Sequence, residues 1–328
     1  MLAAVDSAAW TVTPADAGQP LAGFLRARTG RPWREVKRLI GSGKVFLDGA
    51  PARVEGLRLR GGQSVELRMS APRPRERPEG PAPEALELVY EDAHLVVIDK
   101  PAGISSVPYE EGEERSAMDL VYARWRAQGR KDARGLLKVH RIDKVTSGLL
   151  VYARSEHARV ALDRLFRRHA IERAYLALAE GDVPPGTIDQ PLVKDRGDGL
   201  RWVARAGQTP RKEAITHVEV LERLPAAEPR PGSAGAQPCR ATLCRVTLET
   251  GRTHQIRIHL AANGHPLLGE HVYARDWFQR GAPLLPAPRL MLHATLLGFP
   301  HPVSQAPLRF ERPPPPDFQA VLAALRSA

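Results

Sequence analysis

Five prolines stand between Pro72 and Pro83, and arginine and glutamate fill most of the gaps between them. A proline in a helix interior or a central strand removes a backbone hydrogen bond, so neither element can cross this segment. The composition is typical of an extended, solvated connector. We therefore expect a small module at residues 1–70, a linker at 71–85 and a larger domain at 86–328.

The 328 residues are 43% hydrophobic and 26% charged, which excludes disorder of the whole chain. With only Cys239 and Cys244, a disulfide scaffold is excluded and a reducing compartment fits. The first 25 residues hold no Lys or Arg, unlike a secretory or transit signal. Apolar runs are far shorter than the ~20 residues of a membrane helix. We expect a cytoplasmic monomer that does not enter a membrane.

Lys and Arg number 48 against 37 Asp and Glu, a net charge of +11. Such a field favours an anionic partner, nucleic acid first and an anionic membrane surface second. Arginine-rich composition can also follow from genomic base composition, so the charge alone does not identify the partner.

In the small module, apolar spacing predicts short helices near residues 21–25 and 32–40, then strands at 44–47 and 63–67. Four basic residues on or after the second helix could contact an anionic partner, with a solvated helix face as the alternative: Arg34, Lys37, Arg38 and Lys44. In the larger domain the pattern predicts a helix over 155–169, a strand over 171–178, a mobile loop over 224–238 and a last helix capped by Asp317.

Three segments of the larger domain could carry chemistry. In the first, Asp143 stands in a charged loop that runs into the apolar strand at 148–153; a structural turn is the alternative reading. In the second, Arg257 borders the apolar stripe of a helix expected between an N-cap at Thr253 and a stop at Gly264. A partly buried arginine requires a carboxylate, and Asp143 is a candidate.

The third segment, 171–177, alternates with period two, which puts Arg173 and Tyr175 on one face of a strand. A cation beside an aromatic ring could hold a base against a phosphate, or it could be an ordinary exposed strand face. A zinc site is not expected, because His254 and His259 lie about 140° apart around a helix rather than at the i, i+4 spacing of helical ligands.

These segments together resemble the RluA family of RNA pseudouridine synthases. His140 to Asp143 followed by Thr146 to Leu150 is similar to that family's catalytic-aspartate motif, and Arg252 to Leu260 is similar to a second core motif. Lys100 to Gly103 and Leu290 to Thr295 resemble its flanking segments. One departure is Arg173, where the family usually has lysine. Lys37 to Ile40, Gly43 to Val45 and Asp48-Gly49 separately resemble the small alpha-L RNA-binding module of a ribosomal protein.

The resemblance implies an α+β fold with a mixed, mainly antiparallel sheet, and an isomerase that converts uridine to pseudouridine in structured RNA without cofactor or metal. It makes Asp143 the catalytic aspartate, Arg257 its ion-pair partner and Tyr175 the ring that stacks on the uracil. RNA contacts would come from Arg141, Arg173, Arg252 and His254. Large-subunit ribosomal RNA is the first expected substrate and transfer RNA the second; an RNA-binding or ribosome-assembly factor without turnover is the alternative.

Overall fold

The structure is a computed structural model that describes residues 7–52, 54, 56–71, 86–108, 116–130, 135–195, 200–224, 241–274 and 285–327. The chain forms two compact units, the first made of residues 1–77, 191–212 and 270–283, and the second of 78–190, 213–269 and 284–328. The predicted linker at 71–85 and the predicted loop at 224–238 lie outside the described residues, except for Ala71 and Leu224.

The first unit contains a four-stranded antiparallel sheet, in the order β1-β4-β2-β3, and two helices. Asp48 and Gly49 both have positive φ, as the tight turn between β2 and β3 requires. Residues 191–212 add a separate sheet in the order β12-β11-β13. The elements are β1 (Ser7–Thr11), a short 3-10 helix (Pro14–Asp16), α1 (Leu21–Thr29), α2 (Trp33–Gly41), β2 (Val45–Leu47), β3 (Ala50–Pro51), β4 (Ser64–Arg68), β11 (Leu192–Val193), β12 (Trp202–Val203) and β13 (Arg211–Lys212).

The two helices and the following strands of this unit confirm the prediction from apolar spacing. Phe24, Ile40 and Val65 are among the residues that form its own core. Strand β1 was not predicted, because its five residues alternate between exposed and half-buried and include two alanines, a weak signal for a strand.

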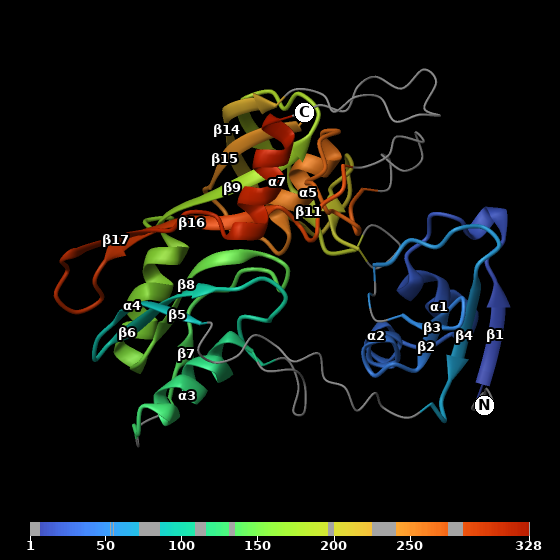
Figure 1. The fold of residues 1–328 in the computed structure, drawn as a ribbon, viewed down its shortest axis with the longest axis horizontal. Coiled ribbons are helices and arrows are strands. Elements are labelled where there is room, and N and C mark those ends of the chain that lie inside the picture. The colour runs from blue at the N-terminus through green and yellow to red at the C-terminus, as the bar shows by residue number, and fades with distance from the viewer. Residues whose placement is uncertain are drawn as a thin grey trace. The chain divides into compact units, whose positions relative to one another are not determined.

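The second unit is built on a ten-stranded sheet whose main path runs β10-β14-β15-β9-β16-β8-β6-β5 (Figure 1). Strand β17 pairs with β16, and β7 pairs with β8. Among the described strands of this sheet, β8 and β16 form the one parallel pair and the others are antiparallel, which confirms the mixed, mainly antiparallel α+β fold. The strands are β5 (Glu87–Glu91), β6 (Leu95–Lys100), β7 (Leu137–Lys138), β8 (Ser147–Ala153), β9 (Glu172–Glu180), β10 (Gly186–Asp189), β14 (Ile215–Leu224), β15 (Ala241–Leu248), β16 (Leu292–Pro300) and β17 (Pro307–Glu311).

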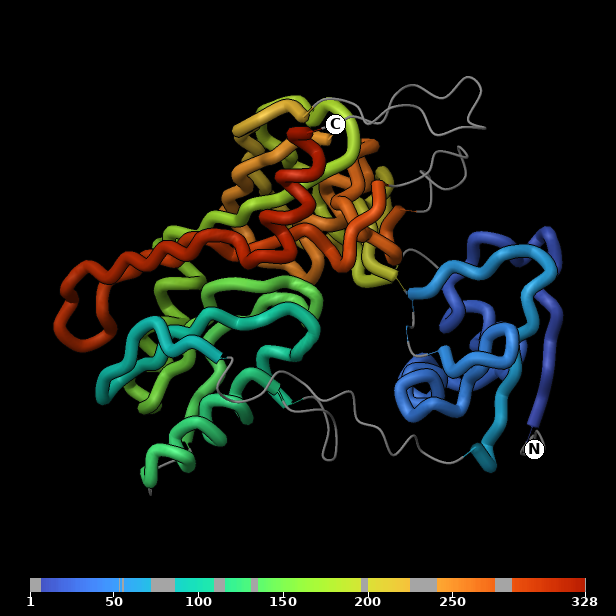
Figure 2. The backbone as a smooth tube through the Cα atoms, in the orientation of Figure 1, coloured from blue at the N-terminus to red at the C-terminus, as the bar shows by residue number. Residues whose placement is uncertain are grey.

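Helices cover both faces of this sheet. Helix α3 (Ala117–Ala127) packs on Leu150 and Tyr152 of β8, whereas α4 (Glu156–Arg167) packs on the alternate residues Leu149 and Val151. Helix α5 (Gln255–Ala262) packs on Ala177 and Ala179 of β9, and α7 (Pro316–Arg326) packs on Leu176 and Leu178 of the same strand. Figure 2 traces the backbone into this last helix, drawn in red next to the C-terminus. No helix among the described residues is long and apolar enough to cross a membrane.

Two predicted helix starts were wrong. Helix α5 begins at Gln255 after His254, which adopts a left-handed conformation with φ of 60°, so Thr253 is not the N-cap. Helix α7 begins at Pro316 after Pro315, so Asp317 lies in the first turn instead of capping it. The Asp317 carboxylate is engaged by Arg289 at 2.5 and 2.9 Å, a long-range contact that local sequence does not reveal.

The parallel junction between β8 and β16 is short and tight. It consists of the pairs Ser147 with His293 and Gly148 with Ala294, and Ala294 also pairs with Tyr175 of β9 on its other side. Gly148 has φ of +113°, and a Cβ there would lie 2.3 Å from the carbonyl oxygen of Ala294. Only glycine allows the two backbones to approach this closely.

We expect Gly148→Ala to lower the free energy of unfolding by about 3 kcal/mol or more, since it adds both a steric overlap and an unfavourable φ. Gly135→Ala is the matched control, because Gly135 has φ of +88° with open space around its Cβ position. That control should lose only about 1–2 kcal/mol. Urea unfolding followed by circular dichroism measures both, and equal losses would contradict the close approach at Ala294.

Candidate active site

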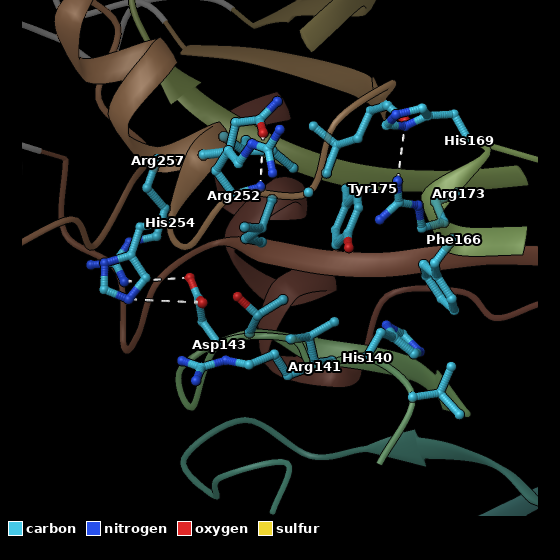
Figure 3. Close-up of a pocket in the computed structure, with 18 of the residues that line it drawn as sticks. His140, Arg141, Asp143, Phe166, His169, Arg173, Tyr175, Arg252, His254 and Arg257 are labelled. Atoms are coloured by element: carbon cyan, nitrogen blue, oxygen red, sulfur yellow. Dashed lines mark hydrogen bonds and ion pairs between the residues drawn. The ribbon is translucent and has the colours of Figure 1, made fainter. Parts of the chain in front are cut away.

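A cavity of about 440 Å³ opens on the second unit (Figure 3). Five parts of the chain line it: the loop before β8, the end of α4 with the turn after it, the start of β9, the segment that leads from β15 into α5, and Leu292 at the start of β16. Its size falls within the range of pockets that bind small molecules or single residues of a polymer.

Asp143 lies on the loop before β8, and hydrogen bonds fix the backbone on both sides of it. The Ser106 hydroxyl donates to the carbonyl of Ile142 at 2.8 Å and accepts from the N–H of the same residue at 3.2 Å. On the other side, the N–H of Gly103 donates to the carbonyl of Lys144 at 2.8 Å. The segment after β6 therefore positions the carboxylate-bearing loop.

Lys100, at the end of β6, connects the segment after β6 to the loop that carries Asp143. Its side chain is fully buried, and its amine donates to the carbonyls of Pro101 at 2.8 Å, Ile104 at 3.0 Å and Lys144 at 3.3 Å. Burial lowers the pKa of Lys100 to about 7, against the opposing effect of the Asp143 carboxylate. Three carbonyl acceptors match the three protons of the ammonium form.

The Asp143 carboxylate faces a guanidinium and an imidazole on the opposite wall (Figure 3). One of its oxygens lies 3.6 Å from a terminal nitrogen of Arg257, and the other lies 3.8 Å from Nε2 of His254. The Arg257 side chain is 7% exposed and that of Asp143 is 16% exposed. The pair therefore joins a buried guanidinium to a partly exposed carboxylate.

A buried glutamine places the helix that carries Arg257. The Gln255 side-chain oxygen accepts from the Thr250 hydroxyl at 2.8 Å and from the N–H of Arg252 at 2.9 Å, while its nitrogen donates to the carbonyl of Ile215 at 2.9 Å. These bonds fix the first turn of α5 against β14 and the chain that enters it. Arg257, two residues further on, is directed at the loop before β8.

Tyr175 lies on β9, in register with Ala294 of β16, and its ring forms part of the cavity wall. The residue is 8% exposed. Burial raises the pKa of its phenol, with the cation of Arg173 acting in the opposite direction. The cavity therefore has a neutral aromatic surface close to its single carboxylate.

Arg173 is held by an aromatic stack that was not predicted. Its guanidinium carbon lies 5.3 Å from the ring centre of Phe166, and that ring stacks on His140 with centres 4.7 Å apart. A terminal nitrogen of Arg173 donates to the carbonyl of Leu248 at 3.4 Å. A Cβ at Gly251 would lie 3.1 Å from the guanidinium, so the glycine leaves room for it.

The structure brings seven of the predicted site residues together around this cavity. They are Arg141, Asp143, Arg173, Tyr175, Arg252, His254 and Arg257. Arg141 is exposed at the surface of the loop. Arg252 donates from Nε to the carbonyl of Glu213 at 2.8 Å. Apart from Asp143, the ionisable side chains of the lining are basic or aromatic, so the cavity suits an anionic substrate.

The other four predicted contacts belong to the first unit. Arg34 and Arg38 are exposed on α2, while Lys37 is half-buried. The Lys44 amine donates to the carbonyl of Ala71, so it is engaged within the unit.

Among the described residues, no group of three or more His, Cys, Asp or Glu side chains is placed to hold a metal ion. His259 is buried and structural, with Nδ1 at 2.8 Å from the Thr216 hydroxyl and Nε2 at 2.9 Å from the carbonyl of Gln190. His254 lies instead beside Asp143.

The residues missed as parts of the site carry weak local signals. Lys100 was noted only within a Lys-Pro-Ala-Gly segment that ends an apolar strand, and a lysine there would ordinarily face solvent. Phe166 fits the apolar face of α4, so periodicity assigns it to the core. His140 stands three residues before Asp143, yet its stacking partner lies on another element.

Comparison with known proteins agrees with this geometry. A family model described as RNA pseudouridylate synthase matches residues 94–262. The ribosomal large subunit pseudouridine synthase D of Xanthomonas campestris pv. campestris is 35% identical over 303 residues, covering 88% of this chain and 82% of that protein. An uncharacterised RNA pseudouridine synthase of Bacillus subtilis is 35% identical over 237 residues, 71% and 70% of the two chains.

The solved structure of human RNA pseudouridylate synthase domain containing 4 superposes with a TM-score of 0.55 and 25% identity, over 73% of this chain and 92% of that one. The fold and the cavity thus define an RNA-modifying isomerase. The chain belongs to the RNA pseudouridylate synthase family.

Two histidines near the site make stability depend on pH. Burial lowers the pKa of His140 to about 3 and that of His293 to about 4, from an ordinary value of 6.5. His140 Nε2 accepts from the N–H of Val151 at 3.1 Å, and His293 lies 3.0 Å from the Ser147 hydroxyl. Both rings are neutral in the folded chain, whereas the unfolded chain takes up protons below pH 6.5.

We therefore expect the free energy of unfolding to fall as pH drops from 6.5 towards 4, by about 1.4 kcal/mol per pH unit for each histidine. Urea unfolding at several pH values measures the slope. His293→Gln should reduce this slope by the contribution of about one proton taken up on unfolding. The control His157→Gln, at an exposed position, should leave the slope as in the wild type. An unchanged slope in His293→Gln would contradict the buried neutral ring.

Proposed function

We propose that this enzyme isomerises specific uridines of large-subunit ribosomal RNA, with Asp143 as the catalytic group. The observation that carries the proposal is one carboxylate, 3.6 Å from a buried arginine, in a cavity whose other charged groups are cationic. The curated relatives named ribosomal large subunit pseudouridine synthase D, among them those of Xanthomonas campestris, Zymomonas mobilis and Nitrosomonas europaea, support the choice of substrate.

The reaction breaks the bond from the ribose to ring nitrogen 1 and joins the same sugar carbon to carbon 5 of the turned uracil. Asp143 frees the base, by attack on the sugar or by removal of a sugar proton, and either route requires the ionised carboxylate. Arg257 pairs with this carboxylate and orients it. Tyr175 stacks on the uracil and assists the loss of the proton from carbon 5.

A base inside a helix cannot reach a cavity of this kind, so the target nucleotide must turn out of its stack. Arg141, exposed on the same loop as Asp143, is suited to occupy the space left behind. Arg173 and Arg252 contribute positive charge for the phosphates of the flipped nucleotide, and His254 offers them a ring N–H. Because one chain supplies all of these groups, we propose a monomer, and ribosomal RNA as substrate implies the cytoplasm.

We further propose that residues 1–70 form an alpha-L-type RNA-binding module, joined by the linker at 71–85 to a catalytic domain at 86–328. Its own core, its two short helices and the exposed Arg34 and Arg38 support this role. A tethered module raises the effective concentration of the catalytic domain near its target.

Asp143→Asn should lower the rate of pseudouridine formation at least about 1000-fold, since the amide can neither attack the sugar nor accept its proton. Chemical labelling and primer extension would map pseudouridine on ribosomal and transfer RNA from cells lacking the protein, complemented with each variant. Asp163→Asn, which alters a carboxylate that pairs with Arg159 outside the cavity, is the matched control and should restore every site.

Three results would contradict the proposal in different ways. Loss of pseudouridine sites from transfer RNA alone would identify transfer RNA, in place of ribosomal RNA, as the substrate. Restoration of the sites by Asp143→Asn would exclude Asp143 as the catalytic group. Retention of every site in cells that still require the protein would favour an RNA-binding or ribosome-assembly role without turnover.

For the module, we expect Arg34→Gln/Arg38→Gln in the full chain to raise KM for ribosomal RNA about tenfold at physiological salt, because two phosphate contacts are lost. Steady-state kinetics with transcribed large-subunit ribosomal RNA measures this. Arg60→Gln/Arg68→Gln removes the same charge from the same unit away from α2 and should leave KM near that of the wild type. Equal effects of the two variants would contradict a role for α2.

A further inference from the structure

Helix α4 ends in a cluster of three exposed arginines, Arg164, Arg167 and Arg168, which we call the α4 arginine cluster. Their spacing of three and four residues puts them on one face of the last turn, with Cβ atoms about 5–6 Å apart. None of them contributes to the buried residues of this helix, which are Ala158 and Leu162.

The same helix shows how an arginine is neutralised when its role is structural. Arg159 pairs with Glu156 one turn before it and with Asp163 at 2.6 Å one turn after it. Within the described residues, Arg164 and Arg168 form no ion pair, and Arg167 donates only from Nε, to the carbonyl of Asp163 at 3.3 Å. The cluster therefore presents uncompensated charge to solvent.

Cations at the end of a helix also interact favourably with its dipole. That effect accounts for a basic residue in the last turn of an ordinary helix, and it contributes here. It does not explain why the uncompensated charge adjoins the cavity: Phe166, Arg167 and His169 all line it.

The end of α4 is held firmly against the site (Figure 3). Phe166 lies between His140 and the guanidinium of Arg173, and the ring of His169 bonds to the carbonyl of Glu249. The cluster thus begins at the cavity edge and continues along an element fixed relative to it. A polymer that places one residue in the cavity must lead its neighbours across the edge.

We propose that the α4 arginine cluster binds the phosphodiester backbone of the RNA strand next to the nucleotide in the cavity. The inference rests on the proposed function for the identity of that nucleotide, and it adds a second contact surface for the strand. Arginine suits this task because its planar group donates two parallel hydrogen bonds to one phosphate. Contacts of this kind position the strand without reading its sequence.

The test uses the full chain and two RNAs. Binding of poly(U) and of transcribed large-subunit ribosomal RNA is measured by filter binding across a range of salt concentrations, and pseudouridine formation is measured on the ribosomal RNA. The variant is Arg164→Gln/Arg168→Gln, since neither residue lines the cavity. On poly(U), the slope of log K against log salt should become shallower by about 1.4, and Kd should rise on the order of tenfold at physiological salt.

Two matched variants separate phosphate binding from structure. Arg164→Lys/Arg168→Lys keeps the charge and should retain the wild-type slope. Arg126→Gln/Arg223→Gln removes two exposed arginines of the same unit that lie outside the cavity and should also retain it. Thermal unfolding of every variant reports any loss of helix stability independently of RNA binding.

A Gln variant with the wild-type Kd and slope on poly(U) would overturn the inference, as would an equal loss of affinity in the Lys variant or in the Arg126 and Arg223 control. Absence of pseudouridine in the wild-type reaction would overturn the proposed function instead. In that case a shallower slope for the Gln variant on poly(U) would still support the RNA contact at α4.

Discussion

The site depends on the one parallel strand pair in the described part of an otherwise antiparallel sheet. At this junction Gly148 of β8, Ala294 of β16 and Tyr175 of β9 stand in one register across three strands. Gly148 is the second residue of β8, and the buried residues Thr146 and Ser147 connect it to the loop that carries Asp143. The close backbone contact at Ala294 therefore sets the distance between the carboxylate and the aromatic wall, and a shift of one residue would turn Tyr175 to the other face.

Two buried basic side chains then hold the Asp143 loop and its carboxylate in place. Lys100 lies beneath the loop, and its amine donates hydrogen bonds to backbone carbonyls. It therefore fixes the position of the loop. Arg257 approaches Asp143 from α5 and forms an ion pair with its carboxylate. Lys100 comes from strand β6 and Arg257 from helix α5, so both basic groups reach the loop from other elements. The remaining basic residues around the cavity give it positive charge, which suits an anionic substrate.

Much of the site could be predicted from the sequence because its key residues lie next to strong periodic elements. The pairing of Asp143 with Arg257, the shared face of Arg173 and Tyr175, and the mixed fold all follow from local pattern or family resemblance, and the structure brings these residues together. The start of α5 was missed because Gln255 is fixed by Ile215, forty residues away. Capping preferences depend on neighbouring residues alone and cannot reveal such a long-range contact.

Arg173, at a position where the family resemblance leads us to expect lysine, shows why the rest of the site required coordinates. A planar guanidinium needs a flat surface and more lateral space than an ammonium. Phe166 supplies the surface, and Gly251, with no side chain, supplies the space. These residues come from α4 and from the segment before α5, so nothing near position 173 in the sequence indicates them. The substitution is accommodated by its surroundings, and the positive charge stays at the cavity edge from which the α4 arginine cluster continues.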